Sequence, residues 1–303
     1  MIANRLTREV ICVRQNCLGT GSRYLKQNIP NTPKGSEMEK RLEQVIALVK
    51  EVGAIQIANC ENKHQIVKKS TQFDLVTEVD KLSEKMIIDF IGARYPEDSI
   101  LAEESGQMDG RSEYIWVVDP LDGTTNYTHR FPVYSISIGL QRGDEAVLGV
   151  VYAPVLDELF HAVRGRGAFL NGQSIVVSSC ANLEDSLLGT GFPYDRSGLD
   201  NNLLQFNHFC PLVQGIRRTG SAAYDLCCVA AGRFDGFWEY QLHPWDVAAA
   251  TLIVEEAGGS VLYLSREGLD VSLAAGNRLI CDQIWMELQK TAGVLPASDL
   301  VKL

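Results

Sequence analysis

The 303-residue sequence has no apolar run long enough to cross a bilayer as a helix. Positive charge is also scarce, since 28 lysines and arginines stand against 38 aspartates and glutamates, which leaves a formal charge of −10. This shortage argues against generic nucleic-acid binding by the body of the chain. An acidic protein still binds phosphate when metal ions supply the positive charge. The carboxylates are therefore candidate metal ligands.

Paired metal-binding cysteines are missing as well. The eight cysteines form no C-x-x-C pair, and no cysteine–histidine spacing is typical of zinc. Several cysteines stand in apolar surroundings and are expected to be small buried hydrophobes. This usage favours a reduced compartment, and we expect the protein to be cytoplasmic.

Three regions are expected along the chain. Residues 1–36 carry six basic residues against Glu9 and have no long apolar stretch, so they are predicted to be a disordered extension rather than a secretory signal. An organellar transit peptide is the alternative. The remainder is long enough for two closely packed subdomains, predicted as an N-terminal α+β part over 37–180 and a C-terminal α/β part over 181–303.

One stretch, 116–126, organises the rest of the chain. The apolar run Ile115–Val118 predicts a buried strand that ends at Asp119-Pro120, because proline cannot donate to a strand ladder. Asp122-Gly123 then completes a turn. Two carboxylates with the Leu121 carbonyl between them are the hard oxygens that Mg²⁺ prefers. The alternative is a simple capped turn, with Thr124 capping a helix.

Other acids stand at similar places. Asp80 lies near the start of a predicted helix and Asp246 in the first turn of another, where the helix dipole favours a carboxylate, so plain capping is the alternative for both. Glu103 follows the predicted strand Ser99–Ala102. The short spacing to the next strand is typical of a hairpin, which would bring a glutamate alongside Asp119.

Taken together, these segments resemble the inositol monophosphatase family of the lithium-sensitive, Mg²⁺-dependent phosphatase superfamily. The resemblance covers about residues 37–295. The segments that carry it are Asp74-Leu75-Val76-Thr77-Glu78-Val79-Asp80, Glu103-Glu104-Ser105, Trp116-Val117-Val118-Asp119-Pro120-Leu121-Asp122-Gly123-Thr124-Thr125-Asn126 and Trp245-Asp246-Val247-Ala248. It implies a mixed α/β fold, a layered α-β-α-β-α sandwich, and a homodimer.

The resemblance also implies roles for single residues. Glu103, Asp119 and the Leu121 carbonyl are expected to bind one Mg²⁺, and Asp119, Asp122 and Asp246 a second, with a third, weaker ion near Glu103. Thr124 and Glu103 would activate the attacking water, with Asp80 holding Thr124. Substrate contacts are expected from Asp122, Gly123, Thr124, Gly220, Ser221, Ala222, Glu239 and Asp246. His243 is expected to be structural.

The implied activity is hydrolysis of inositol-1-phosphate by direct attack of a metal-activated water, with lithium inhibition. Histidinol phosphate, fructose-1,6-bisphosphate and 3′-phosphoadenosine 5′-phosphate are alternative substrates. Bisphosphates rank lower because Glu239 would repel a second phosphate, although Arg217-Arg218 offers positive charge. A different class of function is a partner protein for RNA polymerase or ribosomal RNA processing. The sequence leaves the physiological substrate open.

Overall fold

The computed structural model describes residues 37–61, 67–68, 75–194 and 202–291. The predicted extension over 1–36 and the first residue of the segment beginning at Asp74 lie outside these residues. The described residues all belong to one compact unit, Gly35–Leu303. None of the described helices is both long and apolar enough to cross a membrane.

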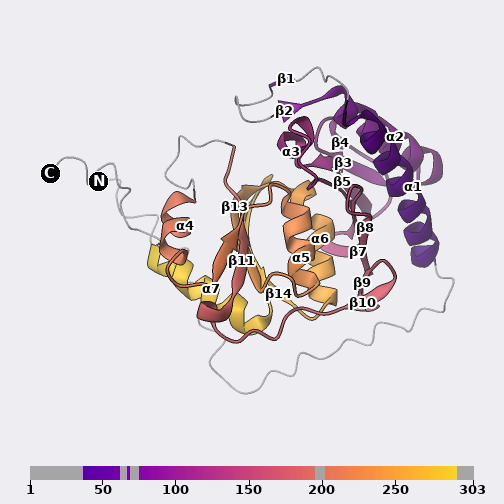
Figure 1. Ribbon diagram of the computed structural model, residues 1–303. Coiled ribbons are helices and arrows are strands. Elements are labelled where there is room, and N and C mark those ends of the chain that lie inside the picture. Colours follow the sequence, from indigo (N-terminus) through magenta and orange to yellow (C-terminus); the bar gives the residue numbers. More distant parts are fainter. Residues whose placement is uncertain (1–36, 62–66, 69–74, 195–201, 292–303) are drawn as a thin grey trace, which may run out of the picture. The chain divides into compact units, whose positions relative to one another are not determined.

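Helices and strands alternate in the pattern of a mixed α/β protein (Figure 1). The helices are α1 (Glu37–Asn59), α2 (Glu78–Arg94), α3 (Thr124–Thr128), α4 (Leu203–Phe209), α5 (Ala222–Ala230), α6 (Pro244–Glu256) and α7 (Arg278–Thr291), with a 3₁₀ turn η1 (Leu183–Asp185). The strands are β1 (Val67–Lys68), β2 (Leu75–Val76), β3 (Ser99–Ala102), β4 (Gly106–Met108), β5 (Tyr114–Asp122), β6 (Ser135–Arg142), β7 (Glu145–Ala153), β8 (Glu158–Val163), β9 (Ala168–Leu170), β10 (Gln173–Ile175), β11 (Leu187–Thr190), β12 (Gly215–Arg217), β13 (Gly236–Leu242), β14 (Ser260–Glu267) and β15 (Asp270–Gly276).

Two large sheets alternate with three helical layers. The first sheet has eight strands in the order β10-β9-β8-β7-β6-β5-β3-β4, and the second has five in the order β12-β11-β13-β15-β14. Helices α1 and α2 cover one face of the first sheet, α5 and α6 pack between the sheets, and α4 and α7 lie against the second sheet (Figure 1). This is the α-β-α-β-α sandwich that was predicted. The predicted subdomain boundary at 180/181 falls between β10 and η1.

Strand β5 is longer than the sequence predicted. It does not end at Pro120 but runs on to Asp122, and its register against β6 shifts between Asp119 and Asp122. A bulge leaves a strand residue unpaired, so the missing N–H of proline is tolerated there. The bulge also turns the end of the strand, and both carboxylates stay on a buried, rigid element.

The predicted hairpin between the Glu103 and Asp119 strands is wrong. Strands β3 and β5 are parallel neighbours, paired from Ser99 with Ile115 to Ala102 with Val118, and β4 supplies the antiparallel partner on the other side of β3. Parallel neighbours end at the same edge of a sheet, so Glu103 still emerges beside Asp119. The Glu103 N–H donates to the Val118 carbonyl at 3.2 Å.

Glycines let helix α6 lie very close to the first sheet. A Cβ on Gly149 of β7 would be 2.5 Å from the Ala249 carbonyl oxygen, and one on Gly139 of β6 would be 3.1 Å from the Ala248 Cβ. Side chains there would push the helix away, since real Cβ atoms do not approach so closely. The helix that carries Asp246 is thereby fixed against β6, which neighbours β5, and against β7 beside it.

Candidate functional site

Three acids from distant parts of the chain meet at one place. Carboxylate oxygens of Asp119, Asp122 and Asp246 all lie within 4.8 Å of one another. The first two leave the end of β5, and Asp246 belongs to the first turn of α6. The sequence predicted that these acids act together, and the structure brings them together.

The acid cluster is an unfavourable arrangement on its own. Burial, together with the charges of Glu103, Asp122 and Asp246, raises the pKa of Asp119 well above its usual value. Burial and the charge of Asp246 raise the pKa of Asp122 to about 7. Clustered, buried carboxylates repel one another unless a cation lies among them. These donors, all hard oxygens, therefore fit a divalent metal ion.

Asp122 is held in place by the start of α5. Its Oδ2 accepts hydrogen bonds from the Ser221 hydroxyl at 2.6 Å and from the Ala223 N–H at 2.8 Å, while its Oδ1 is 3.3 Å from the Ala222 nitrogen. The first N–H groups of a helix have no partner within it, so a carboxylate satisfies them well. Ser221 is only 1% exposed, and its hydroxyl is engaged behind Asp122. Neither Ala223 nor the contact itself was anticipated from the sequence.

Asp80 and Thr124 form the second predicted grouping. The Thr124 hydroxyl lies 2.9 Å from Asp80 Oδ1 and 3.2 Å from the Leu121 carbonyl oxygen. The other oxygen of Asp80 accepts from the Thr77 N–H at 2.9 Å, which completes a capping box at the start of α2. Asp80 therefore caps α2, as the alternative interpretation of the sequence expected, and it also accepts a hydrogen bond from Thr124.

Asp246 is oriented by its own helix start. The His243 N–H donates to Asp246 Oδ2 at 2.7 Å, and Pro244 occupies the first helical position, where no N–H is needed. The His243 imidazole stacks on the Trp245 indole with ring centres 4.8 Å apart and planes 3° apart. These contacts give His243 the structural place that the sequence predicted.

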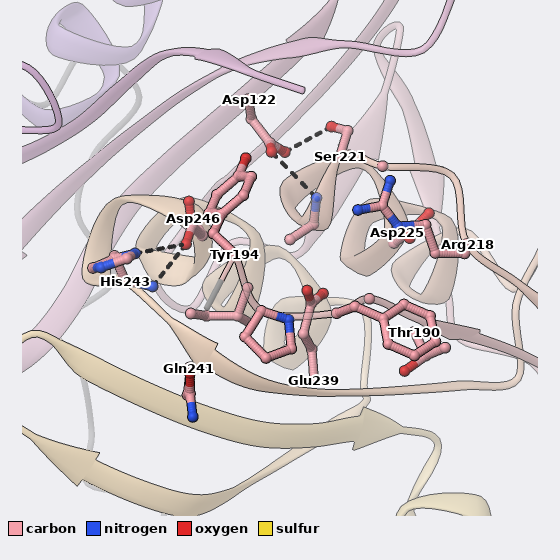
Figure 2. A pocket seen from close by; sticks show the side chains of 16 residues that line it. Asp122, Thr190, Tyr194, Arg218, Ser221, Asp225, Glu239, Gln241, His243 and Asp246 are labelled. Carbon is pink, nitrogen blue, oxygen red and sulfur yellow. Dashed lines mark hydrogen bonds and ion pairs between the residues drawn. The ribbon is translucent and has the colours of Figure 1, made fainter. Parts of the chain in front are cut away.

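A pocket opens from the acid cluster toward the second sheet (Figure 2). Asp122 and Asp246 line it together with Gly220, Ser221, Ala222 and Glu239, the residues of the expected substrate side. The Glu239 side chain is 9% exposed, and burial, with the charges of Asp225 and Asp246, raises its pKa well above the usual value. Expected metal ligands and expected substrate contacts thus share one cavity.

Gly191 makes room for Glu239. A Cβ on this glycine would be 2.0 Å from Oε1 of Glu239. The backbone also approaches closely between Gly123 and Gly220. A Cβ on Gly123, whose φ is 99°, would be 3.1 Å from the Gly220 carbonyl oxygen. Only glycine takes such a φ without strain and permits this contact.

Several residues that line the pocket were not predicted as site residues. Arg218 was considered only as a countercharge for bisphosphates, and Asp225 and Tyr194 were not considered. The Asp225 carboxylate accepts from the Thr219 hydroxyl at 2.6 Å. Tyr194 lies close enough to Asp122 and Asp246 for their charges to act on its hydroxyl (Figure 2). Asp225 lies one helical turn after Ser221, the residue before α5. This spacing in the sequence could have shown that Asp225 lies near Gly220 and Ser221.

Known proteins are similar to this chain over most of its length. The model of the inositol monophosphatase family matches residues 37–298. The chain belongs to this family. Members are metal-dependent phosphatases, and the acid cluster of Asp119, Asp122 and Asp246 is a suitable metal site.

Individual members of the inositol monophosphatase family are similar in sequence and structure. Inositol-1-monophosphatase of Synechocystis is 47% identical over 240 residues, which are 78% of this chain and 83% of that protein. Nus factor SuhB of Pseudomonas aeruginosa is 47% identical over 194 residues, 62% of this chain and 72% of its own. The structure of inositol monophosphatase from Anabaena has a TM-score of 0.76 and 40% identity, and the match covers 84% of this chain and 97% of that one.

Proposed function

We propose that this inositol monophosphatase family member hydrolyses a phosphate monoester with Mg²⁺, and that its substrate is inositol-1-phosphate. The observation that carries the proposal is the shared cavity, in which the cluster of Asp119, Asp122 and Asp246 opens onto the buried Glu239 carboxylate. The acids hold the cation that a phosphate needs. The Glu239 carboxylate accepts hydrogen bonds from hydroxyl groups, which a polyol supplies.

The proposed ligands divide into two sets. Glu103, Asp119 and the Leu121 carbonyl bind one Mg²⁺, and Asp119 also joins Asp122 and Asp246 to bind a second. A third, weaker ion lies near Glu103. Oxygen ligands of this kind suit Mg²⁺. When bound, the ions lower the pKa of the attacking water and stabilise the leaving oxygen.

The chain's own groups orient the reactants. Thr124, whose hydroxyl is fixed by Asp80 at 2.9 Å, holds the attacking water together with Glu103, which takes its proton. The N–H groups of Gly123 and Thr124 bind phosphate oxygens. Phosphate-monoester hydrolysis is among the slowest reactions in water, so this placement contributes directly to the rate.

The substrate's ring lies at the other end of the pocket. Glu239 accepts from ring hydroxyls, and the backbone of Gly220 and Ala222 forms the adjoining wall. Two buried acids, Glu239 and Asp225, face this end, and Arg218 is the cation beside them. A second phosphate is disfavoured there because it would meet both carboxylates.

Phosphate release across a substrate panel tests the proposal. The panel contains inositol-1-phosphate, histidinol phosphate, fructose-1,6-bisphosphate and 3′-phosphoadenosine 5′-phosphate, each assayed with and without Mg²⁺. We expect the largest kcat/KM on inositol-1-phosphate and loss of activity in Asp119→Asn. A clear preference for another substrate would reject inositol-1-phosphate and keep the metal-dependent chemistry. Inhibition by millimolar Li⁺ is expected in the same assay.

A second candidate function rests on the similarity to the Nus factor of Pseudomonas aeruginosa. In this case the chain would act in transcription as a partner of RNA polymerase. The discriminating measurement is binding to RNA polymerase by wild-type protein and by Asp119→Asn. Binding that survives in a catalytically dead variant supports the partner function, and absence of binding in both rejects it.

We also propose a cytoplasmic homodimer built from two subdomains that divide at residues 180/181. Light scattering after size-exclusion chromatography tests the dimer, and fluorescence microscopy of the full-length chain fused to a fluorescent protein tests the location. Expression of 37–180 and 181–303 as separate chains tests the division. Recovery of activity on mixing the two pieces supports it.

A further inference from the structure

Helix α2 carries a buried acid that the proposed mechanism does not use. Glu84 is 2% exposed and lies one helical turn after Asp80. Its Oε2 accepts a hydrogen bond from the Glu104 N–H at 2.8 Å, and its Oε1 accepts from the Ser105 hydroxyl. Both donors belong to the turn between β3 and β4.

This turn also carries Glu103, which contacts the site. Burial raises the pKa of Asp119, and the Glu103 carboxylate lies close enough for its charge to raise that pKa further. The turn is attached on two sides, because the Glu103 N–H donates to Val118 of β5 at 3.2 Å and the next two residues are bonded to Glu84. Without Glu84, the attachment to β5 remains but the attachment to α2 is lost.

One helix therefore supports both halves of the proposed water-activating pair. Asp80 of α2 binds the Thr124 hydroxyl directly, and Glu84, four residues later, binds the backbone beside Glu103. Residues four apart lie on the same face of a helix, so Asp80 can contact Thr124 while Glu84 contacts the turn that carries Glu103. We propose that Glu84 is a positioning residue that fixes the Glu103 carboxylate for metal binding.

A carboxylate suits this task better than other side chains. It accepts from two donors at once, and hydrogen bonds to a charged acceptor are stronger than those between neutral groups. Glutamine keeps one acceptor oxygen for the Glu104 N–H, and its NH₂ group can only donate to the Ser105 hydroxyl, in a neutral bond that is weaker than one to a carboxylate. Alanine leaves the Glu104 N–H without its partner. Glu84→Gln is therefore expected to loosen the turn, and Glu84→Ala to free it from α2.

The proposal rests on the proposed function, in that Glu103 is taken as a metal ligand. Its test uses Mn²⁺ alone as the probe, measured by electron paramagnetic resonance on the purified full chain without substrate. Partners that orient metal ligands change affinity by roughly 10–100-fold. We expect the Mn²⁺ affinity of Glu84→Ala to fall about tenfold, and that of Glu84→Gln to fall by less. Glu103→Gln identifies the site that is affected.

Glu158→Gln is the matched control. Glu158 is another acid bonded to two partners, Tyr224 and Arg233, and it lies on β8 away from the turn. Its substitution tests whether loss of any such carboxylate weakens metal binding, and we expect wild-type Mn²⁺ affinity. If Glu84→Ala does not fold, the Mn²⁺ affinity of Glu84→Gln tests the proposal.

Unchanged Mn²⁺ affinity in the folded Glu84 variants, with only a lower melting temperature, would overturn the proposal. The proposal would also be overturned if the Mn²⁺ affinity fell equally in the Glu84 variants and in Glu158→Gln. Failure of the proposed function gives a different result, because the wild-type chain would then bind no Mn²⁺ and release no phosphate. The two failures are therefore distinguishable. Restoration of the Glu84→Gln rate at higher Mg²⁺, with an unchanged KM for substrate, supports the positioning role.

Discussion

The hydroxyl of Thr124 lies 2.9 Å from the carboxylate of Asp80, although 44 residues separate them in the sequence. Thr124 begins α3, and Asp80 lies in the first turn of α2. The same hydroxyl is 3.2 Å from the Leu121 carbonyl. Asp80 thus fixes which way the hydroxyl of Thr124 is directed.

Removal of the Thr124 hydroxyl is expected to slow catalysis without unfolding the protein. We predict that Thr124→Ala lowers kcat by about 10²–10³-fold, because the attacking water loses one of the two groups that hold it for proton transfer, a step worth about 10²–10⁴-fold. Thr124→Ser keeps the hydroxyl and retains most activity. Steady-state phosphate release checks this. The control is Thr128→Ala on the same short helix, whose hydroxyl donates to the Thr125 carbonyl. Equal losses in both variants would contradict the prediction.

Metal-free protein is expected to become less stable as the pH rises. Burial raises the pKa of Asp122 to about 7 and that of Asp225 to about 8, whereas unfolded aspartate titrates near about 4. The folded chain therefore binds more protons than the unfolded chain between about pH 4 and pH 8, and the free energy of unfolding falls across this window.

Thermal melts in a chelator at pH 5 and pH 8 measure this effect. We expect the higher melting temperature at pH 5, and a larger stabilisation by Mg²⁺ at pH 8, where the acids are charged. Asp225→Asn removes one of the groups whose pKa is raised without altering the acid cluster, so the difference in melting temperature between pH 5 and pH 8 should shrink. A melting temperature that is higher at pH 8 in the chelator would show the sign to be wrong.

A side chain at Gly191 is expected to weaken substrate binding. The new Cβ of Gly191→Ala would be 2.0 Å from Glu239 Oε1, so the carboxylate must move. We predict a rise in KM of roughly tenfold, equivalent to the loss of about one hydrogen bond to a charged group, with a smaller change in kcat. Gly92→Ala on α2 is the matched control because its Cβ would meet no atom within 4 Å. An unchanged KM in Gly191→Ala would argue against Glu239 as a substrate ligand.

Arg41 is expected to matter for stability rather than for activity. Its guanidinium is paired with Asp98 at 2.5 Å and lies over the rings of Tyr95 and Trp116. We predict that Arg41→Ala lowers the free energy of unfolding by about 3–5 kcal/mol, because Asp98 remains as a buried charge without its partner. Denaturant unfolding measures this. Lys85→Ala breaks an exposed pair with Asp89 and should cost less than about 1 kcal/mol.

Local chemistry allowed parts of the site to be predicted from the sequence. Asp80 and Asp246 stand at helix starts and Asp119 at a buried apolar run, and the structure has them there. The family resemblance indicated that these acids meet. The order of layers followed from the same resemblance, because periodicity alone does not say which helix covers which sheet.

Other features depend on contacts that no local pattern reveals. Pro120 predicted the end of a strand, but β5 continues because the bulge against β6 accommodates proline. The spacing between Glu103 and Asp119 predicted a hairpin, but the short β4 takes the antiparallel place beside β3. The bonds of Glu84 to Glu104 and Ser105 join a helix to a turn about 20 residues away, so they appear only in the folded chain.

The close packing of α6 on Gly139 and Gly149 has a consequence for biosynthesis. Asp246 reaches Asp119 and Asp122 only when α6 has docked on β6 and β7. While the ribosome is still translating the region before α6, the emerging chain holds Asp119 and Asp122 but lacks the third acid. The nascent protein therefore cannot capture a metal at the complete cluster until most of its length has been made. If the cluster binds a metal as proposed, the cell's metal ions would stabilise finished molecules in preference to fragments.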